Sequence, residues 1–176
     1  MENPQSISKF SLNPGLMLGG ALVFISATIY ASGIDIFENT WIGWITYLVM
    51  AFTFYYYQTS YRDNQNEGFL SLGDAVKIGV TIAVIAGAIT AVYNVIFANF
   101  IAPDYLDKVL LKMEEKMVEQ DPNIRQEEID LAIKMTKKVM SPYISVPLEI
   151  VGKAVSGLVL SLATGFFVKR KNPDFS

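Results

Sequence analysis

Four long apolar blocks, separated by polar segments, dominate the hydrophobic pattern of this 176-residue chain. Helices built from blocks of about 17 to 22 residues would be roughly 25 to 33 Å long, close to the hydrocarbon thickness of a bilayer. The pattern therefore predicts an all-α, polytopic membrane protein with a single membrane domain over residues 1–176. The four transmembrane spans are expected at about residues 14–32, 41–57, 78–97 and 147–168.

The first block has the terminal residues of a complete helix. Asn13 suits an N-cap, Pro14 suits the first helical position, and Gly33 suits a C-terminal cap. A cleavable signal peptide is the alternative, because Ala-Ser-Gly at the end of the block resembles a cleavage site. Lys9 alone makes a weak basic region and the block is long for a signal core, so we interpret it as a membrane span.

The second block carries aromatic residues at both ends. Trp41 and Trp44 mark its start, and three tyrosines at 55–57 mark its end. Aromatic rings gather at the two headgroup layers of a bilayer, so these clusters place the span. The polar segment from Gln58 to Gly68 is expected to be a loop.

The third block begins with a capping-box-like pair, Ser71 and Asp74. A helix from Leu72 to about Phe100 would be roughly 43 Å long, which exceeds the bilayer core. We therefore expect its first two turns to lie in the interface and residues 78–97 to lie in lipid.

A charged insertion over about residues 103–142 separates the third and fourth spans. Asp121-Pro122 should divide it into two helices, with Asp121 or Asn123 capping the second, and Pro142 should end that helix before a last span that starts near Pro147. The insertion is thus expected to form an extramembrane helical hairpin whose apolar stripes face each other or the membrane surface; a groove for a protein partner is the alternative. These stripes contain Leu106, Leu110, Met113 and Met117 in the first helix and Ile129, Ile133, Thr136 and Met140 in the second.

The distribution of basic residues indicates an orientation. The turn between the first two spans has acidic residues, Asp35 and Glu38, but no basic ones. The opposite side would hold Lys9, Arg62, Lys77 and the tail Lys169, Arg170 and Lys171. The lysines of the insertion would favour a cytoplasmic insertion. The short segments next to the spans differ more clearly in their number of basic residues, so the positive-inside rule predicts cytoplasmic termini and an insertion on the outer side.

Small residues recur at spacings of four in three of the spans. In lipid, small side chains let helix backbones approach closely, so these positions are expected to be packing seams within the chain; a homodimer interface is the alternative. The positions are Gly15, Gly19, Ala27 and Ala31 in the first span, interrupted by Val23, then Gly79, Ala83, Gly87 and Ala91, and finally Gly157, Ser161 and Gly165.

Three stretches resemble a known family: SISKFSLNPGLMLGGALVF at 6–24, EGFLSLGDAVKIGVTIAVIAGAI at 67–89 and YNVIFANFIAPDYLDKVL at 93–110. They are similar to the bacterial membrane family catalogued as domain of unknown function 4199. The resemblance implies a four-helix protein of a bacterial inner (cytoplasmic) membrane and brings no functional residues with it.

Composition restricts the available chemistry. The chain has no cysteine and no histidine, which excludes thiolate and imidazole catalysis and the ligand sets that need them. A net charge of −3 gives no reason to expect nucleic-acid binding, and no cofactor, metal or catalytic motif is visible.

A possible intramembrane polar site consists of Glu149, Lys153 and Asn94. Ionisable residues in a span suggest function by default. However, Glu149 follows Pro147 closely enough to sit near the interface, and Lys153 can snorkel or pair with it at i, i+4, so we interpret them as an anchor.

Three classes of function follow. A non-catalytic membrane subunit or scaffold, bound to the lipid bilayer, needs only the bundle and the insertion, and is the preferred interpretation. A small carrier or channel would need Glu149, Lys153 and Asn94 to converge. An enzyme is the weakest, since only the spacing of Lys153 and Ser156 resembles a Ser/Lys hydrolase pair.

Overall fold

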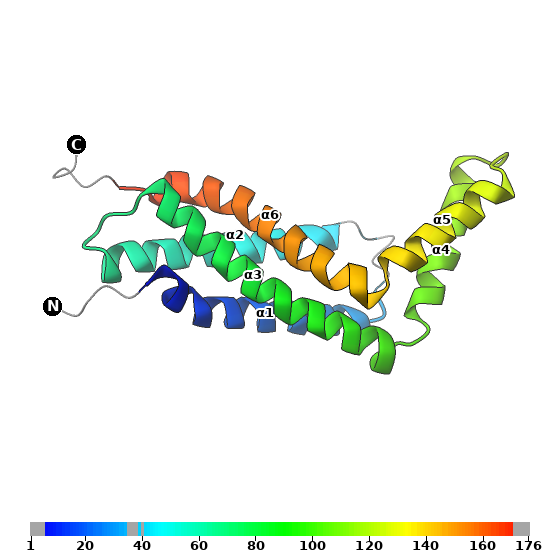
Figure 1. The fold of residues 1–176 in the computed structure, drawn as a ribbon, viewed down its shortest axis with the longest axis horizontal. Helices are drawn as coiled ribbons and strands as arrows, with labels where there is room; N and C mark the ends of the chain where they lie inside the picture. The colour runs from blue at the N-terminus through cyan, green and yellow to red at the C-terminus, as the bar shows by residue number, and fades with distance from the viewer. Residues whose placement is uncertain (1–5, 35–38, 40, 171–176) are drawn as a thin grey trace. The chain divides into compact units, whose positions relative to one another are not determined.

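The computed structural model describes residues 6–34, 39 and 41–170, and within them it is all-α, as predicted. Asp35, Glu38 and Lys171 lie outside the described residues. Six α-helices and one π-helical turn follow one another in that part of the chain (Figure 1). They are α1 (Ile7–Ala31), α2 (Trp41–Gln65), α3 (Leu72–Ile96), the π-helical turn η1 (Phe97–Ile101), α4 (Tyr105–Gln120), α5 (Gln126–Val139) and α6 (Pro142–Val168).

Three of the helices in the described residues are long and apolar enough to cross a membrane. They are α1, α3 together with η1, and α6. Helix α2 is as long as α1 but less apolar, because polar residues fill its last two turns. The chain forms two compact units, Met1–Thr90 with Ile150–Ser176 and Ala91–Glu149.

Helix α1 begins two turns earlier than the sequence predicts. Asn13 is not its N-cap and Pro14 lies inside the helix; Ser6 is the N-cap, and its side chain accepts a hydrogen bond from the Lys9 N–H at 3.4 Å. The extra turns are held by packing, since the Phe10 ring stacks edge-on against Tyr61 with 5.0 Å between centroids. The other end is as predicted: Gly33 has a φ of +66° and its N–H donates to the carbonyl of Tyr30.

Helix α2 continues through the segment that was expected to be a loop. Residues 58–65 are helical because one face of this extension is buried. Phe54, Gln58 and Tyr61, spaced three and four residues apart, all lie on that face. The helix ends at Gln65, and the turn that follows closes at Gly68, which has a φ of +85° and donates its N–H to the carbonyl of Arg62.

The start of α3 is as predicted, and its end differs. The Ser71 hydroxyl oxygen accepts the Asp74 N–H at 3.0 Å, and the hydroxyl and the Asp74 carboxylate lie 2.7 Å apart. The last turn widens into η1, where the Ala102 N–H reaches back five residues to the carbonyl of Phe97.

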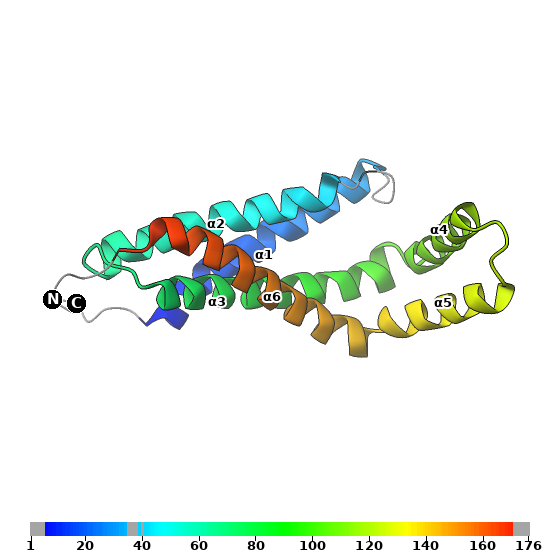
Figure 2. The same cartoon turned by 90° about the horizontal axis from the view of Figure 1, so that it is seen from above.

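Helices α4 and α5 pack side by side within the second unit (Figure 2). Leu110 and Ile129 are buried, and the Thr136 hydroxyl donates to the sulfur of Met113 at 3.3 Å. The two predicted apolar stripes, one on each helix, therefore face each other at these residues. Asp121 ends α4 as predicted, but neither Asp121 nor Asn123 caps α5, because the Asp121 carboxylate accepts the Asn123 N–H in a local turn.

Helix α6 begins at Pro142, which was expected to end α5, and not near Pro147. Only Met140 and Ser141 separate the two helices. Proline suits the first turn of a helix, since its missing N–H has no intrahelical partner there. The Ser141 carbonyl accepts the Ser145 N–H at 2.8 Å, so the new helix is established at once.

Helices α3 and α6 approach closely through small residues in the first unit. A Cβ atom built on Gly79 would lie 2.2 Å from the Ser161 Cβ, and one built on Gly157 would lie 2.5 Å from the Ala83 Cβ. Gly165 faces Ala75 in the same way. These distances are too short for real carbon contacts, so the two helices need glycine at these positions.

Helix α1 meets α3 through a second contact of the same kind. Cβ atoms built on Gly15 and Gly19 would lie 2.6 Å from atoms of Ile85 and Ile89, respectively. At Gly87 the neighbour is the flexible stem of Lys153, at 3.0 Å, and Ala91 is buried. The small positions of the sequence pattern in α3 and α6, with Gly15 and Gly19 of α1, are thus next to another helix or buried, whereas Ala31 at the end of α1 is exposed.

The close approach of α3 and α6 predicts that two glycines of α6 differ in how well they tolerate replacement by alanine. Gly157→Ala should lower the stability of the protein in detergent by about 1 to 3 kcal/mol, the usual cost of overpacking. Gly152 has nothing within 4 Å of its added Cβ, so Gly152→Ala should be neutral or stabilising, because alanine favours the helix. Thermal unfolding followed by circular dichroism measures both. Equal stability of the two variants would contradict this packing.

Candidate functional site

Two of the three residues of the predicted polar site contact each other. Asn94 is near the end of α3, and its side-chain amide donates to the Glu149 carboxylate on α6 at 2.8 Å. Asn94 is exposed and Glu149 is half-buried. The pair thus lies at the periphery of its unit, and is not enclosed by packed side chains.

Lys153 is half-buried one turn further along α6. Its Cβ and Cγ lie 3.0 Å from the position that a Cβ on Gly87 would occupy, so its aliphatic stem covers the glycine. The sequence grouped Lys153 with Glu149 by spacing, and the structure gives its stem a packing role.

The chemistry that the Asn94–Glu149 pair offers is limited to hydrogen bonding and charge. An amide and a carboxylate can hold a proton, a small cation or an amine, but neither is an activated nucleophile. Within residues 6–34, 39 and 41–170, no three carboxylates gather as metal ligands would.

A second polar site was missed in the sequence, because its central residue, Gln58, lies in the segment expected to be a loop. Gln58 is fully buried in α2. Its side-chain Nε2 donates to the carbonyls of Ala75 on α3 at 3.1 Å and Ser161 on α6 at 3.3 Å. One amide thereby connects three helices.

Arg62, one turn after Gln58, extends this connection to the end of α6. Its Nη1 donates to the carbonyl of Val168, the last residue of α6, at 3.0 Å. Its Nε and Nη2 donate to both carboxylate oxygens of Asp63, at 2.7 and 2.9 Å, and this hydrogen bonding holds the pKa of Asp63 below its ordinary value. Gln58 and Arg62 with these partners are called the Gln58–Arg62 network below.

The segments beyond these helices also pair with each other. Leu70 and Arg170 exchange two backbone hydrogen bonds of 3.0 Å, forming an isolated antiparallel bridge between the α2–α3 loop and the end of α6. Leu70 and Val168 are fully buried beside it. The sequence offered one signal for this region: Phe54, Gln58 and Tyr61 continue the helical spacing beyond the tyrosine cluster.

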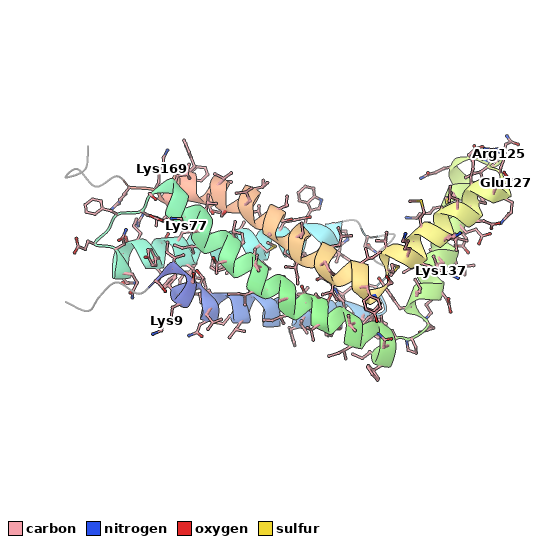
Figure 3. The ribbon with its side chains drawn as sticks, viewed as in Figure 1. Lys9, Lys77, Arg125, Glu127, Lys137 and Lys169 are labelled. Carbon is pink, nitrogen blue, oxygen red and sulfur yellow. The ribbon has the colours of Figure 1, made fainter. Side chains whose placement is uncertain are left out.

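The Gln58–Arg62 network lies at the basic end of the first unit. Figure 3 shows Lys9, Lys77 and Lys169 at the same end, near the starts of α1 and α3 and the end of α6. The hydroxyl and carboxylate of the Ser71–Asp74 cap also lie there, and Lys77 pairs with Asp74 at 3.0 Å. Of the basic residues that the sequence assigned to one side, Lys9, Arg62, Lys77 and Lys169 thus lie at one end of the unit.

The described fold is that of a membrane-like helical protein, with three helices long and apolar enough to cross a bilayer. A family model described as "Protein of unknown function (DUF4199)" matches residues 14–170, so the chain belongs to this family, as its sequence resemblance implied. Neither a curated protein nor a solved structure matches the chain.

The Arg62 side chain should contribute to stability mainly through Val168. Only 14% of that side chain is exposed, and hydrogen bonds from a charged donor are worth about 1.5 to 3 kcal/mol. Arg62→Gln should therefore destabilise the protein by roughly 1 to 3 kcal/mol in detergent. Asp63→Asn is the matched control: it removes an exposed ion pair and leaves the bond to Val168, so its cost should stay below about 1 kcal/mol. A larger effect for Asp63→Asn would assign the stability to the ion pair.

Proposed function

We propose that this protein is a non-catalytic membrane subunit or scaffold in a bacterial inner membrane. The observation that carries this proposal is that three polar side chains of the bundle donate hydrogen bonds to other helices. Gln58 and Arg62 donate to helix carbonyls, and Asn94 donates to Glu149. Such interhelical hydrogen bonds hold a bundle together in lipid, where hydrophobic association is weak.

The proposal includes a fourth crossing, by α2. Its first 17 residues form the apolar block at 41–57, and Met50 and Phe54 are fully buried in the same core as Leu18 and Leu22 of α1. Trp44 and Tyr56, near the two ends of this block, are exposed, as suits residues that meet two headgroup layers. A helix so closely paired with α1 would enter the bilayer with it.

The proposed orientation has both termini in the cytoplasm and α4 and α5 on the outer side. It is supported by the basic end of the first unit, since Lys9, Arg62, Lys77 and Lys169 would all lie at the cytoplasmic surface. Helices α4 and α5 would then present a charged surface outside, where a protein partner of the scaffold could bind.

The alternative function is a small carrier or channel that uses the Asn94–Glu149 pair. One specific observation favours it: a carboxylate and an amide from two membrane-length helices lie 2.8 Å apart. An intramembrane carboxylate that binds protons or cations would have such a partner.

Topology can be tested with single cysteines, because the natural chain contains none. Glu119→Cys at the exposed end of α4 and Asn64→Cys at the exposed end of α2 give two probes. In intact cells, a membrane-impermeant maleimide should label the cysteine at 119 and spare the one at 64, which should react only after the membrane is opened. The reverse pattern would contradict the proposed orientation or the crossing by α2, and labelling of both would mean that α3, the span between the two probes, does not cross.

The scaffold and the carrier differ in ion flux through proteoliposomes. Purified protein should leave an imposed pH or potassium gradient unchanged, as read by an internal pH dye, and Glu149→Gln should behave like the natural protein. A flux that Glu149→Gln abolishes would overturn the scaffold and establish the carrier, since the carboxylate would then be the binding group.

A further inference from the structure

The outer face of α5 combines exposed apolar residues with exposed lysines. Leu131, Met135 and Val139 follow each other at four-residue spacing, and their exposed fractions are 58, 60 and 43%. The side chains that pack toward α4, among them Ile129 and Thr136, lie roughly a third of a turn round the helix from this stripe. The apolar stripe is therefore left over after α4 and α5 have packed.

Three lysines lie beside this stripe: Lys134 and Lys138 border one edge of it, and Lys137 lies further round the helix on the same side. All are exposed, and all lie in the half of α5 that leads to α6. The acidic residues Glu127, Glu128 and Asp130 lie in the other half. Figure 3 shows the separation, with Arg125 and Glu127 near the α4–α5 turn and Lys137 toward α6.

Chain connectivity brings the basic half of α5 to the membrane surface. Helix α6 is about 40 Å long, longer than the hydrocarbon core, so its first turns should lie among the headgroups. Tyr143 in those turns is 92% exposed, as suits a ring in the headgroup layer. Lys138 precedes Pro142 by four residues and is within about 14 Å of it even in a fully extended chain.

Helix-end electrostatics explains only part of this arrangement. Lys137 and Lys138 are in the last turn of α5, where positive charge stabilises the helix dipole. Lys134 is outside that turn, and the dipole gives no reason for the exposed stripe of Leu131, Met135 and Val139. An apolar stripe bordered by lysines is what an amphipathic helix needs to lie on an anionic bilayer.

We infer that the lysine-bearing face of α5 docks on the bilayer that α6 enters and binds the phosphates of anionic phospholipid headgroups. The lysines supply the charge complementarity, and Leu131, Met135 and Val139 enter the boundary between headgroups and acyl chains. This inference rests on the proposed membrane crossing of α6, but it is independent of which side of the membrane α5 occupies.

The experiment uses the full chain in lipid vesicles, with a single Met135→Cys carrying bimane and a nitroxide on the headgroups of some lipids. Quenching reports that residue 135 lies on the bilayer. We expect strong quenching with 30% phosphatidylglycerol and weak quenching in pure phosphatidylcholine. We also expect quenching to weaken at about 0.5 M NaCl, because salt screens exposed charges.

Charge variants identify the groups responsible. Changing Lys134, Lys137 and Lys138 together to Gln should weaken docking on the order of a hundredfold, at roughly fivefold per lysine near an anionic surface. Changing the same three to Arg should preserve it. The matched control changes Lys108, Lys112 and Lys116 of α4 to Gln and should leave quenching unchanged.

Three outcomes would overturn the inference. Quenching that is independent of lipid charge, or that persists in the α5 Gln variant, would show that headgroup phosphates do not hold the helix. If the bimane becomes protected from quenching only when the number of protein copies per vesicle rises, this face of α5 binds a second copy of the chain and not lipid. Failure of the proposed α6 crossing is distinguishable, since a cysteine at position 169, just beyond α6, would then be labelled from the same side of the membrane as the one at 119.

Discussion

The close contact between α3 and α6 is the constraint on which the rest of the bundle depends. Gly79 meets Ser161 and Gly157 meets Ala83 at distances that leave no room for a larger side chain. In lipid, apolar side chains gain little by leaving one apolar surrounding for another, so van der Waals contact between backbones must supply much of the association. Small residues at four-residue spacing provide that contact over several turns.

The polar contacts of the first unit follow from this approach. Gln58 reaches the carbonyls of Ala75 and Ser161 together because α3 and α6 are close enough for one side chain to bridge them. Arg62 reaches the end of α6 in the same way, and its cationic group meets a carbonyl at the negative end of a helix. The Asn94–Glu149 contact is different, since it lies at an exposed periphery and is made by side chains alone. The hydrogen bonds of the Gln58–Arg62 network therefore hold the helices together at one end of the bundle.

This distribution of polar groups supports the proposed role more than any single residue does. Family membership brings no activity with it, and Gln58, Arg62 and Asn94 each donate a hydrogen bond to another helix. The unusual surface is instead on α5, where lysines and apolar residues share one face. A membrane scaffold with a surface-docked helix would expose that helix pair to partners while keeping it close to the bilayer.

The sequence by itself determined the elements that depend on local chemistry and on length. Apolar blocks of bilayer length predicted α1, α3 and α6, the Ser71–Asp74 pair predicted the start of α3, and Gly33 predicted the end of α1. Asn94 and Glu149, which the sequence named with Lys153 as a possible polar site, contact each other in the fold.

Only the tertiary structure decided the helix extensions and the partners. Phe10, Gln58 and Tyr61 lengthen α1 and α2 because their side chains are buried against other helices, and a local pattern contains no information on such distant contacts. The Gln58–Arg62 network was hidden for the same reason: its acceptors are backbone carbonyls of Ala75, Ser161 and Val168. Every residue has a carbonyl, so no residue type marks the ones that a folded chain will bring within reach.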